Sequence, residues 1–151
     1  MRAAETKLKT MEVNCLTEGP VSQEIVSRLI EKMNSRTDAG GHMIFCGQVR
    51  ADEINGKKVR AIEYSAYIEL VDAEAERIKK SVFAEFNDVK SVDIIHSTGI
   101  VPSGQISLLV LVSAGHRQQA FQACSKTVEL IKQKLPVWKK EIYDDDSQSW
   151  K

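Results

Sequence analysis

Basic side chains are concentrated near the carboxyl end of this 151-residue chain. Between residues 113 and 140 there are six bases and a single acid, Glu129, although the whole chain carries 21 Lys and Arg against 21 Asp and Glu. A local excess of cations in a neutral protein favours an anionic ligand over nucleic acid held by bulk charge. The six bases are Arg117, Lys126, Lys132, Lys134, Lys139 and Lys140.

His116 and Arg117 stand where a helix is predicted to begin, ahead of apolar residues at helical spacing. The free N–H groups and the dipole already make this end of a helix positive, so cationic side chains are disfavoured there unless an anion binds. The pair therefore predicts a receptor for a phosphate or carboxylate. The alternative is that both side chains point into water.

Lys139 and Lys140 follow a proline and a tryptophan at positions 136 and 138, which can fix the backbone that carries them. A lysine held in an apolar, cation-rich pocket can have a lowered pKa and act as acid, base or nucleophile. Lys132 lies in the last turn of the predicted helix, where the dipole favours any base. Arg50, at the end of a predicted strand, is a candidate anion clamp or a surface arginine.

The sequence contains no recognisable metal or cysteine-nucleophile motif. Its three histidines stand on separate predicted elements without H-x-x-x-H or C-x-x-C spacing, so we predict no metal site and no resident cofactor. His116 and Cys124 are separated by about 12 Å along one predicted helix, too far for a catalytic pair. We interpret Cys124 as a buried small hydrophobe and Cys46 likewise as a strand residue.

Three cysteines without close pairing indicate a reducing compartment, and we expect a cytoplasmic protein.

The chain is long enough for one domain and shows no linker, repeat or low-complexity segment. Strand and helix patterns alternate, but helices are too few for a regular βαβ series. We therefore predict a single α+β domain at 11–151, with a mixed or antiparallel sheet and about three helices, behind a flexible leader at 1–10. The longest apolar run, Ile106–Ala114, is too short to cross a membrane.

The expected strands lie at 11–16, 43–49, 59–67, 89–98 and 105–113, and the expected helices at 21–34, 70–86 and 117–135. The pair Asn55-Gly56 predicts a chain reversal. The strand at 105–113 is nearly continuous in apolar residues, which predicts a central position in the sheet. No element is assigned to the tail beyond Pro136.

Several segments together resemble the large (catalytic) subunits of molybdopterin synthase, the MoaE family. They occur in the family's order and spacing across residues 43–150, and the Pro-x-Trp-Lys-Lys-Glu segment is the most specific of them. The segments are FCGQVR at 45–50, EYSAY at 63–67, IIHSTG at 94–99, SAGHR at 113–117, and LIK at 130–132 leading to PVWKKE at 136–141.

The resemblance implies an α/β-hammerhead-like fold and a sulfur transfer reaction. Cyclic pyranopterin monophosphate would receive two sulfurs and become the dithiolene of molybdopterin. The sulfur would come from the thiocarboxylate at the C-terminal Gly-Gly of a small ubiquitin-like partner. Both reactants are anionic, so they would be the ligands that the cluster of basic side chains binds.

The resemblance also implies roles for six residues. Lys132 and Lys139 match the family's active-site lysines, with Lys132 as general acid or base and Lys139 assisting it and stabilising the thiocarboxylate or an acyl-linked intermediate. The substrate phosphate and pterin would be held by Arg50, His116 and Arg117, and Phe45 would line the pocket.

Helix geometry predicts that this site is shared between two protomers. Arg117 and Lys132 are separated by about 22 Å along one helix, too far for both to touch one small substrate. We expect His116 and Arg117 of one protomer to complete the site of the other. The resemblance implies the matching assembly, a homodimer of large subunits with a small subunit at each end. The alternative is a non-enzymatic adaptor that binds an anionic peptide tail or nucleotide; it would need no positioned lysines.

Overall fold

The computed structural model describes residues 15–151, which fold into a mixed sheet with three helices. The expected leader at 1–10 and most of the expected first strand lie outside the described residues. The elements are β1 (Leu16–Glu18), α2 (Gln23–Asn34), β2 (Gly41–Gln48), β3 (Glu53–Ile54), β4 (Lys57–Ala66), α3 (Ile68–Glu85), β5 (Val89–Pro102), β6 (Ile106–Ala114), α4 (Arg117–Lys134), β7 (Val137–Tyr143) and β8 (Gln148–Trp150).

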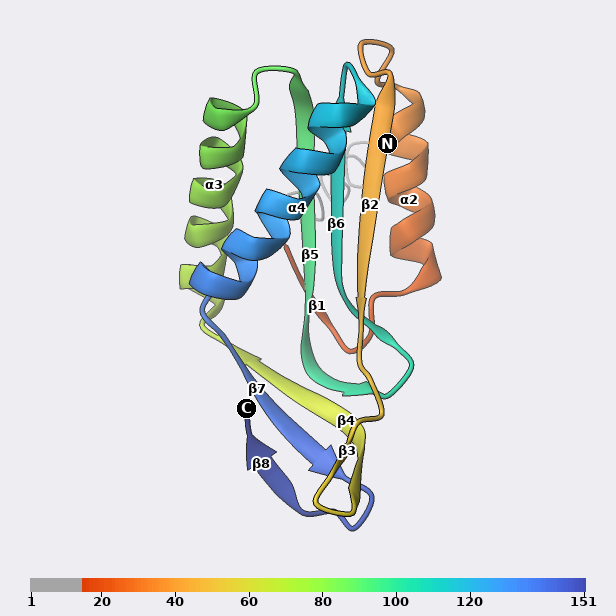
Figure 1. Ribbon diagram of the computed structural model, residues 1–151, viewed down its shortest axis with the longest axis vertical. Coiled ribbons are helices and arrows are strands. Elements are labelled where there is room, and N and C mark those ends of the chain that lie inside the picture. The colour runs from red at the N-terminus through yellow and green to blue at the C-terminus, as the bar shows by residue number, and fades with distance from the viewer. Residues whose placement is uncertain (1–14) are drawn as a thin grey trace, which may run out of the picture.

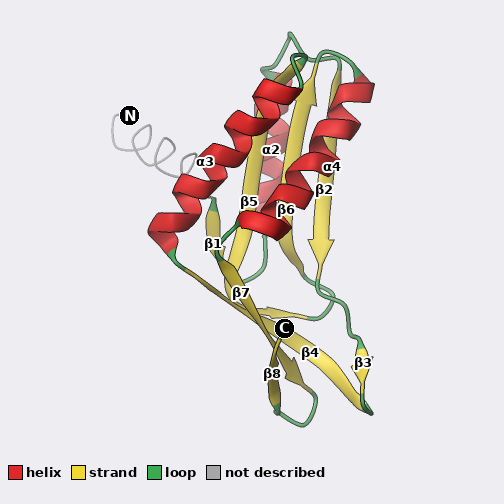
Figure 2. Ribbon diagram, turned by 60° about the vertical axis from the view of Figure 1, so that its left-hand side comes forward, coloured by secondary structure: helices red, strands yellow, loops and turns green. Residues whose placement is uncertain are grey.

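The strands follow the order β2-β6-β5-β4-β7-β8, with β1 beside β5 and β3 beside β4. Helices α3 and α4 cover one face of the β2-β6-β5 part, and α2 lies on the opposite face (Figures 1 and 2). The β1–β5 pair is parallel, whereas the other strand pairs in the described chain are antiparallel. The predicted single α+β domain with a mixed sheet and three helices is confirmed.

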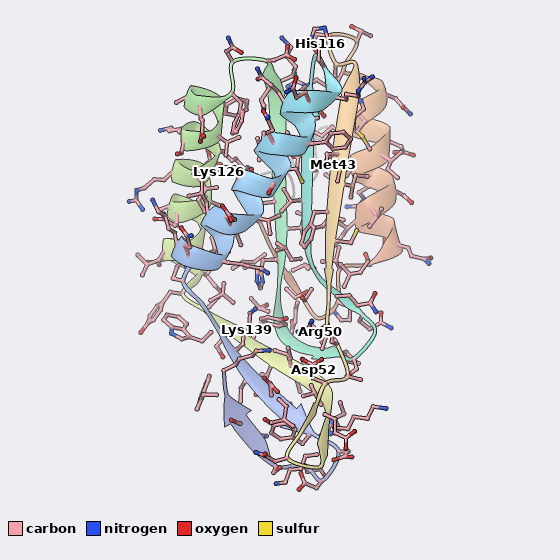
Figure 3. All side chains as sticks on the ribbon, viewed as in Figure 1. Met43, Arg50, Asp52, His116, Lys126 and Lys139 are labelled. Carbon is pink, nitrogen blue, oxygen red and sulfur yellow. The ribbon has the colours of Figure 1, made fainter. Side chains whose placement is uncertain are left out.

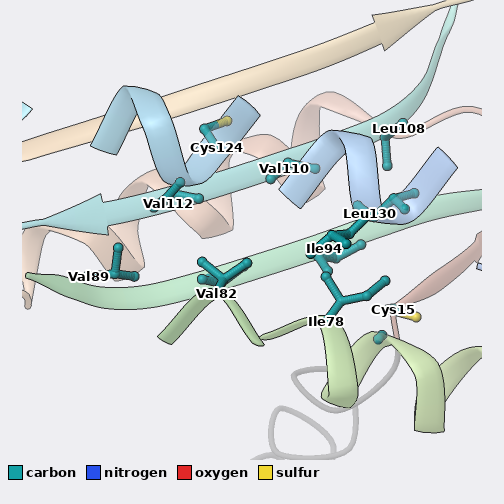
Figure 4. Close-up of a cluster of buried hydrophobic side chains, with 14 of the residues drawn as sticks. Cys15, Ile78, Val82, Val89, Ile94, Leu108, Val110, Val112, Cys124 and Leu130 are labelled. Carbon is teal, nitrogen blue, oxygen red and sulfur yellow. The ribbon is translucent and has the colours of Figure 1, made fainter. Parts of the chain in front are cut away.

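The main core lies between the sheet and the pair α3 and α4 (Figure 4). Its sheet layer is formed largely by β6, which pairs with β2 on one side and β5 on the other. Side chains such as Val110 and Val112 are fully buried, and Cys124 on α4 packs with them. The predicted central position of this strand and the burial of Cys124 are thus confirmed. Cys46, in contrast, is a strand residue but an exposed one.

Strand β5 joins the two parts of the sheet because it bends at Gly99. Its first half pairs with β6, and residues 99–102 pair with β4. Gly99 has a φ of 75°, a left-handed conformation that favours glycine and turns the strand toward β4. The expected end of the strand at 98 was therefore wrong, since β5 continues past the bend to Pro102.

The tail beyond Pro136 forms two strands that the sequence analysis did not assign. Pro136 follows the end of α4, and β7 then pairs with β4 in a register that places Lys139 opposite Tyr64. Strand β8 pairs in turn with β7, with Trp150 opposite Lys140. The predicted reversal at Asn55-Gly56 is confirmed as a β3–β4 hairpin in which both turn residues have positive φ.

Candidate functional site

A cavity of about 560 Å³ lies where the end of α4 and the end of β2 meet strands β4, β5 and β7. It brings together four of the six residues selected from the sequence: Phe45, Arg50, Lys132 and Lys139. Figure 3 shows Arg50 and Lys139 near the middle of the molecule, at the level of this cavity. Its lining also includes Tyr64, His96, Glu141 and Lys151.

Two different elements bring the two lysines to the cavity. Lys132 lies in the last turn of α4, and Lys139 follows on β7 after the turn at Pro136. Alternation along β7 places Lys139 and Glu141 on the cavity side. Lys140 does not line the cavity; its ammonium group lies 3.4 Å from Glu63 and 5.0 Å from the centre of the Trp150 ring.

Lys139 is partly buried, and no described acid lies within ion-pair distance of it or of Lys132. Burial lowers the pKa of the Lys139 ammonium, and the positive charges of Lys132 and Lys151 lower it further. Each of these causes favours the neutral amine over the ammonium ion near neutral pH. The predicted environment of a functional lysine is therefore present at Lys139.

Lys151 reaches the cavity because β8 pairs with β7. Its backbone N–H donates to the Lys139 carbonyl at 3.0 Å. Its ammonium nitrogen lies 3.4 Å from Oε1 of Glu141, a residue that is only 5 % exposed. The second carboxylate oxygen of Glu141, Oε2, is buried without a hydrogen-bond partner in the described chain. The cavity thus contains one buried carboxylate among several cations.

His96 and Tyr64 form the wall of the cavity on β5 and β4. Their rings meet edge to face with centres 5.2 Å apart. The Tyr64 hydroxyl donates to the Ser107 hydroxyl at 3.0 Å, and burial raises its pKa. Burial also lowers the pKa of the His96 imidazole. Both side chains are therefore neutral and held in fixed positions.

Arg50 and Phe45 lie on the β2 side of the cavity. Arg50 follows the end of β2 and is exposed, with its guanidinium 3.4 Å from Asp52. Phe45 is half-buried and packs against the main core. An exposed guanidinium at the rim of an open cavity can turn toward an anion that enters it.

His116 and Arg117 lie at the opposite end of α4, outside this cavity. Figure 3 shows His116 at that end of the molecule. The Asp88 carboxylate accepts hydrogen bonds from the His116 backbone N–H at 2.8 Å and from its ring at 3.1 Å. Desolvation raises the pKa of Asp88, but these hydrogen bonds and the histidine charge outweigh it, so the pKa is lowered overall. A carboxylate of the same chain therefore lies beside His116, at the helix end for which the sequence predicted an anionic ligand.

Four cavity residues were not predicted from the sequence: His96, Tyr64, Glu141 and Lys151. Glu141 could have been found from strand alternation, because it stands two residues after Lys139. No local signal identifies the other three, since each depends on pairing between distant strands. Among residues 15–151, no group of three or more His, Cys, Asp and Glu side chains is arranged to hold a metal ion. No helix in that part of the chain is long and apolar enough to span a membrane.

Comparison with known proteins places this chain in one family. The family model described as MoaE protein matches residues 16–134. The molybdopterin synthase catalytic subunit of Dictyostelium discoideum is 38% identical over 122 residues, which cover 80% of this chain and 77% of that protein.

Two solved structures share the fold. Molybdopterin synthase from Staphylococcus aureus superimposes with a TM-score of 0.80 at 27% identity, over 92% of this chain and 96% of that one. A complex of subunits 1 and 2 of molybdopterin-converting factor from Helicobacter pylori gives a TM-score of 0.75 at 19% identity, over 91% and 89% of the two chains. This chain therefore belongs to the MoaE protein family.

Proposed function

We propose that this chain is the catalytic subunit of a molybdopterin synthase. It would transfer two sulfurs from the C-terminal thiocarboxylate of a small ubiquitin-like partner to cyclic pyranopterin monophosphate, forming the molybdopterin dithiolene. The observation that carries the proposal is the placement of Lys132, Lys139 and Arg50 around one open cavity, with no acid of residues 15–151 paired with Lys139. The positive charges of such a site can stabilise the negative charges of two anionic reactants.

Lys132 is proposed as the general acid or base, and Lys139 as the group that assists it and stabilises the thiocarboxylate or an acyl-linked intermediate. A lysine with a lowered pKa can exchange a proton near neutral pH. Arg50 would hold the substrate phosphate or pterin, and Phe45 would line the pocket. No resident metal or other cofactor is required by these roles, so a chelator should leave the rate unchanged.

His116 and Arg117 would act in the cavity of a second protomer. Both side chains are exposed at the end of α4 that lies away from the cavity of their own chain. This placement supports the shared site expected from the spacing along the helix. The assembly would be a homodimer of this chain with one small subunit bound to each protomer. The Helicobacter pylori neighbour, a complex of two subunits, supports such a partner.

Cys15, Cys46 and Cys124 are all free in the structure. Unpaired cysteines suit a reducing compartment, and we propose the cytoplasm as the site of action.

The function is tested by reconstitution. The purified chain is mixed with cyclic pyranopterin monophosphate and a small subunit that carries a C-terminal thiocarboxylate, and dithiolene formation is measured. We expect product with the thiocarboxylate and none with the same subunit ending in a carboxylate. Tight binding of the small subunit without any product would overturn the enzymatic proposal in favour of the adaptor.

A further inference from the structure

The tautomer of His96 is fixed by its backbone neighbour. Ring nitrogen Nδ1 lies 2.8 Å from the carbonyl oxygen of Ser97. A carbonyl oxygen only accepts hydrogen bonds, so Nδ1 carries the hydrogen and donates it. In the neutral ring, the lone pair is then on Nε2. No residue in the described chain hydrogen-bonds to Nε2, so this nitrogen is free to accept a proton in the cavity that His96 lines.

The surroundings keep this ring neutral and oriented. His96 is 6 % exposed, and its ring packs edge to face against Tyr64, which is itself anchored on Ser107. Burial lowers the pKa of the imidazole; the Ser97 carbonyl raises it, and the Lys139 charge lowers it again. The other titratable or charged groups that line the same cavity are Cys46, Arg50, Asp52, Tyr64, Lys132, Glu141 and Lys151.

The proposed reaction contains a step that needs a neutral base. Once a thiocarboxylate sulfur has bonded to a carbon of the substrate, carrier and substrate are joined through an acyl thioester. Release of the carrier requires the bond between the acyl carbon and the sulfur to break, and water is a nucleophile that can break it. Both lysines can hold the anions. Among the described residues, however, no hydrogen bond orients either ammonium group as the Ser97 carbonyl orients the His96 imidazole.

We propose that His96 is the catalytic base for this hydrolysis, an inference that rests on the proposed function. Nε2 takes a proton from a water molecule while the water oxygen bonds to the acyl carbon. The tetrahedral intermediate collapses by breaking the carbon–sulfur bond. The electron pair remains on the sulfur as a thiolate on the substrate, and the carrier leaves with a C-terminal carboxylate. The imidazolium and the new carboxyl group return their protons to the thiolate or to solvent.

Two substitutions test the role. His96→Gln replaces the basic ring by an amide, and His96→Asn retains an N–H donor at the position of Nδ1 for the Ser97 carbonyl. We expect each variant to accumulate the carrier–substrate thioester, detected by mass spectrometry after an acid quench, and to form dithiolene about a hundredfold more slowly. His42→Asn is the matched control. His42 also hydrogen-bonds through Nδ1, at 2.7 Å from the Ser113 hydroxyl, but does not line the cavity.

The pH profile separates a base from a structural histidine. The wild-type rate of thioester hydrolysis should fall on acidification through a pKa below the usual value of about 6.5. That acidic limb should be absent in His96→Gln. A variant that is misfolded or destabilised would slow every step without accumulation of thioester. Thermal unfolding would reveal such a loss of stability.

The outcomes distinguish this inference from the proposed function. If the wild-type protein forms no dithiolene, the proposed function fails, and the role of His96 fails with it. If the wild-type protein is active and the His96 variants neither accumulate thioester nor lose the acidic limb, only the inference on His96 is overturned. Nitrogen NMR of the imidazole gives an independent check: an Nε2–H tautomer at neutral pH would also overturn it.

Discussion

The ammonium group of Lys151 lies 3.4 Å from the carboxylate of Glu141, which is only 5 % exposed. Lys151 also adds a positive charge beside Lys139, and that charge contributes to the lowered pKa of Lys139. A residue of the tail therefore acts on both the buried acid and the partly buried base of the cavity.

Lys151→Met should raise the pKa of Lys139, because one of the charges that oppose its protonation is removed. The pH dependence of Lys139 labelling by an amine-specific reagent, followed by mass spectrometry, measures this change. Its midpoint should move to higher pH in Lys151→Met and stay unchanged in Lys151→Arg. Equal midpoints in wild type and Lys151→Met would show that Lys151 exerts no influence on Lys139.

Asp88→Asn should destabilise the protein near neutral pH, since the carboxylate at the start of α4 accepts two hydrogen bonds from His116. The pKa of Asp88 is lowered in the folded state. Its contribution is therefore complete above the unfolded pKa of about 3.9 and is lost as pH falls through the lower folded value.

Urea unfolding at several pH values measures this effect. The wild type should be more stable than Asp88→Asn near neutral pH, and the difference should shrink in acid. Asp38→Asn is a suitable control, because the carboxylate of Asp38 forms an exposed ion pair with Arg36. A difference that grows on acidification would contradict the assignment.

Lys139 and Lys140 are neighbours in sequence but should differ sharply in their effect on catalysis. Lys139 lines the cavity, whereas Lys140 pairs with Glu63 outside it. Lys139→Ala should lower the rate of dithiolene formation by about a hundredfold or more, the usual effect of losing a proton-transfer group. Lys140→Ala should retain most of the rate. A similar loss of rate in both variants would show that catalysis depends on the total positive charge of this strand and not on the position of Lys139.

A shared site predicts complementation between two inactive variants. In a mixed dimer of Lys132→Ala and Arg117→Ala protomers, one site carries both substitutions and the other carries neither. Exchange of protomers should therefore restore activity that each parent lacks. If the mixed protein remains as inactive as its parents, Arg117 does not reach the site of the partner.

The sequence predicted the elements whose signals are local. The helical spacing of apolar residues predicted α4, and its end before Pro136 followed from the missing N–H of proline. The apolar run of β6 predicted its central position. The resemblance selected Phe45, Arg50, Lys132 and Lys139, and the structure gathers all four around one cavity.

The remaining features depend on contacts between distant segments. Asp88 and His116 are 28 residues apart, so the sequence showed the positive helix end but not the acid that lies beside it. His96 and Tyr64 meet only because β5 bends at Gly99 and pairs with β4. Lys151 reaches the cavity because β8 pairs with β7, and no motif in the tail predicts that pairing.

The central claim is that a lysine of this cavity performs proton transfer during sulfur transfer, and it is tested most directly by comparing two lysines of one helix turn. Lys132 lines the cavity, and Lys134 lies in the same last turn of α4 without lining it. We predict that Lys132→Ala lowers the rate of dithiolene formation from the thiocarboxylated partner by about a hundredfold or more, while Lys134→Ala leaves it close to wild type. An unchanged rate in Lys132→Ala would contradict the account.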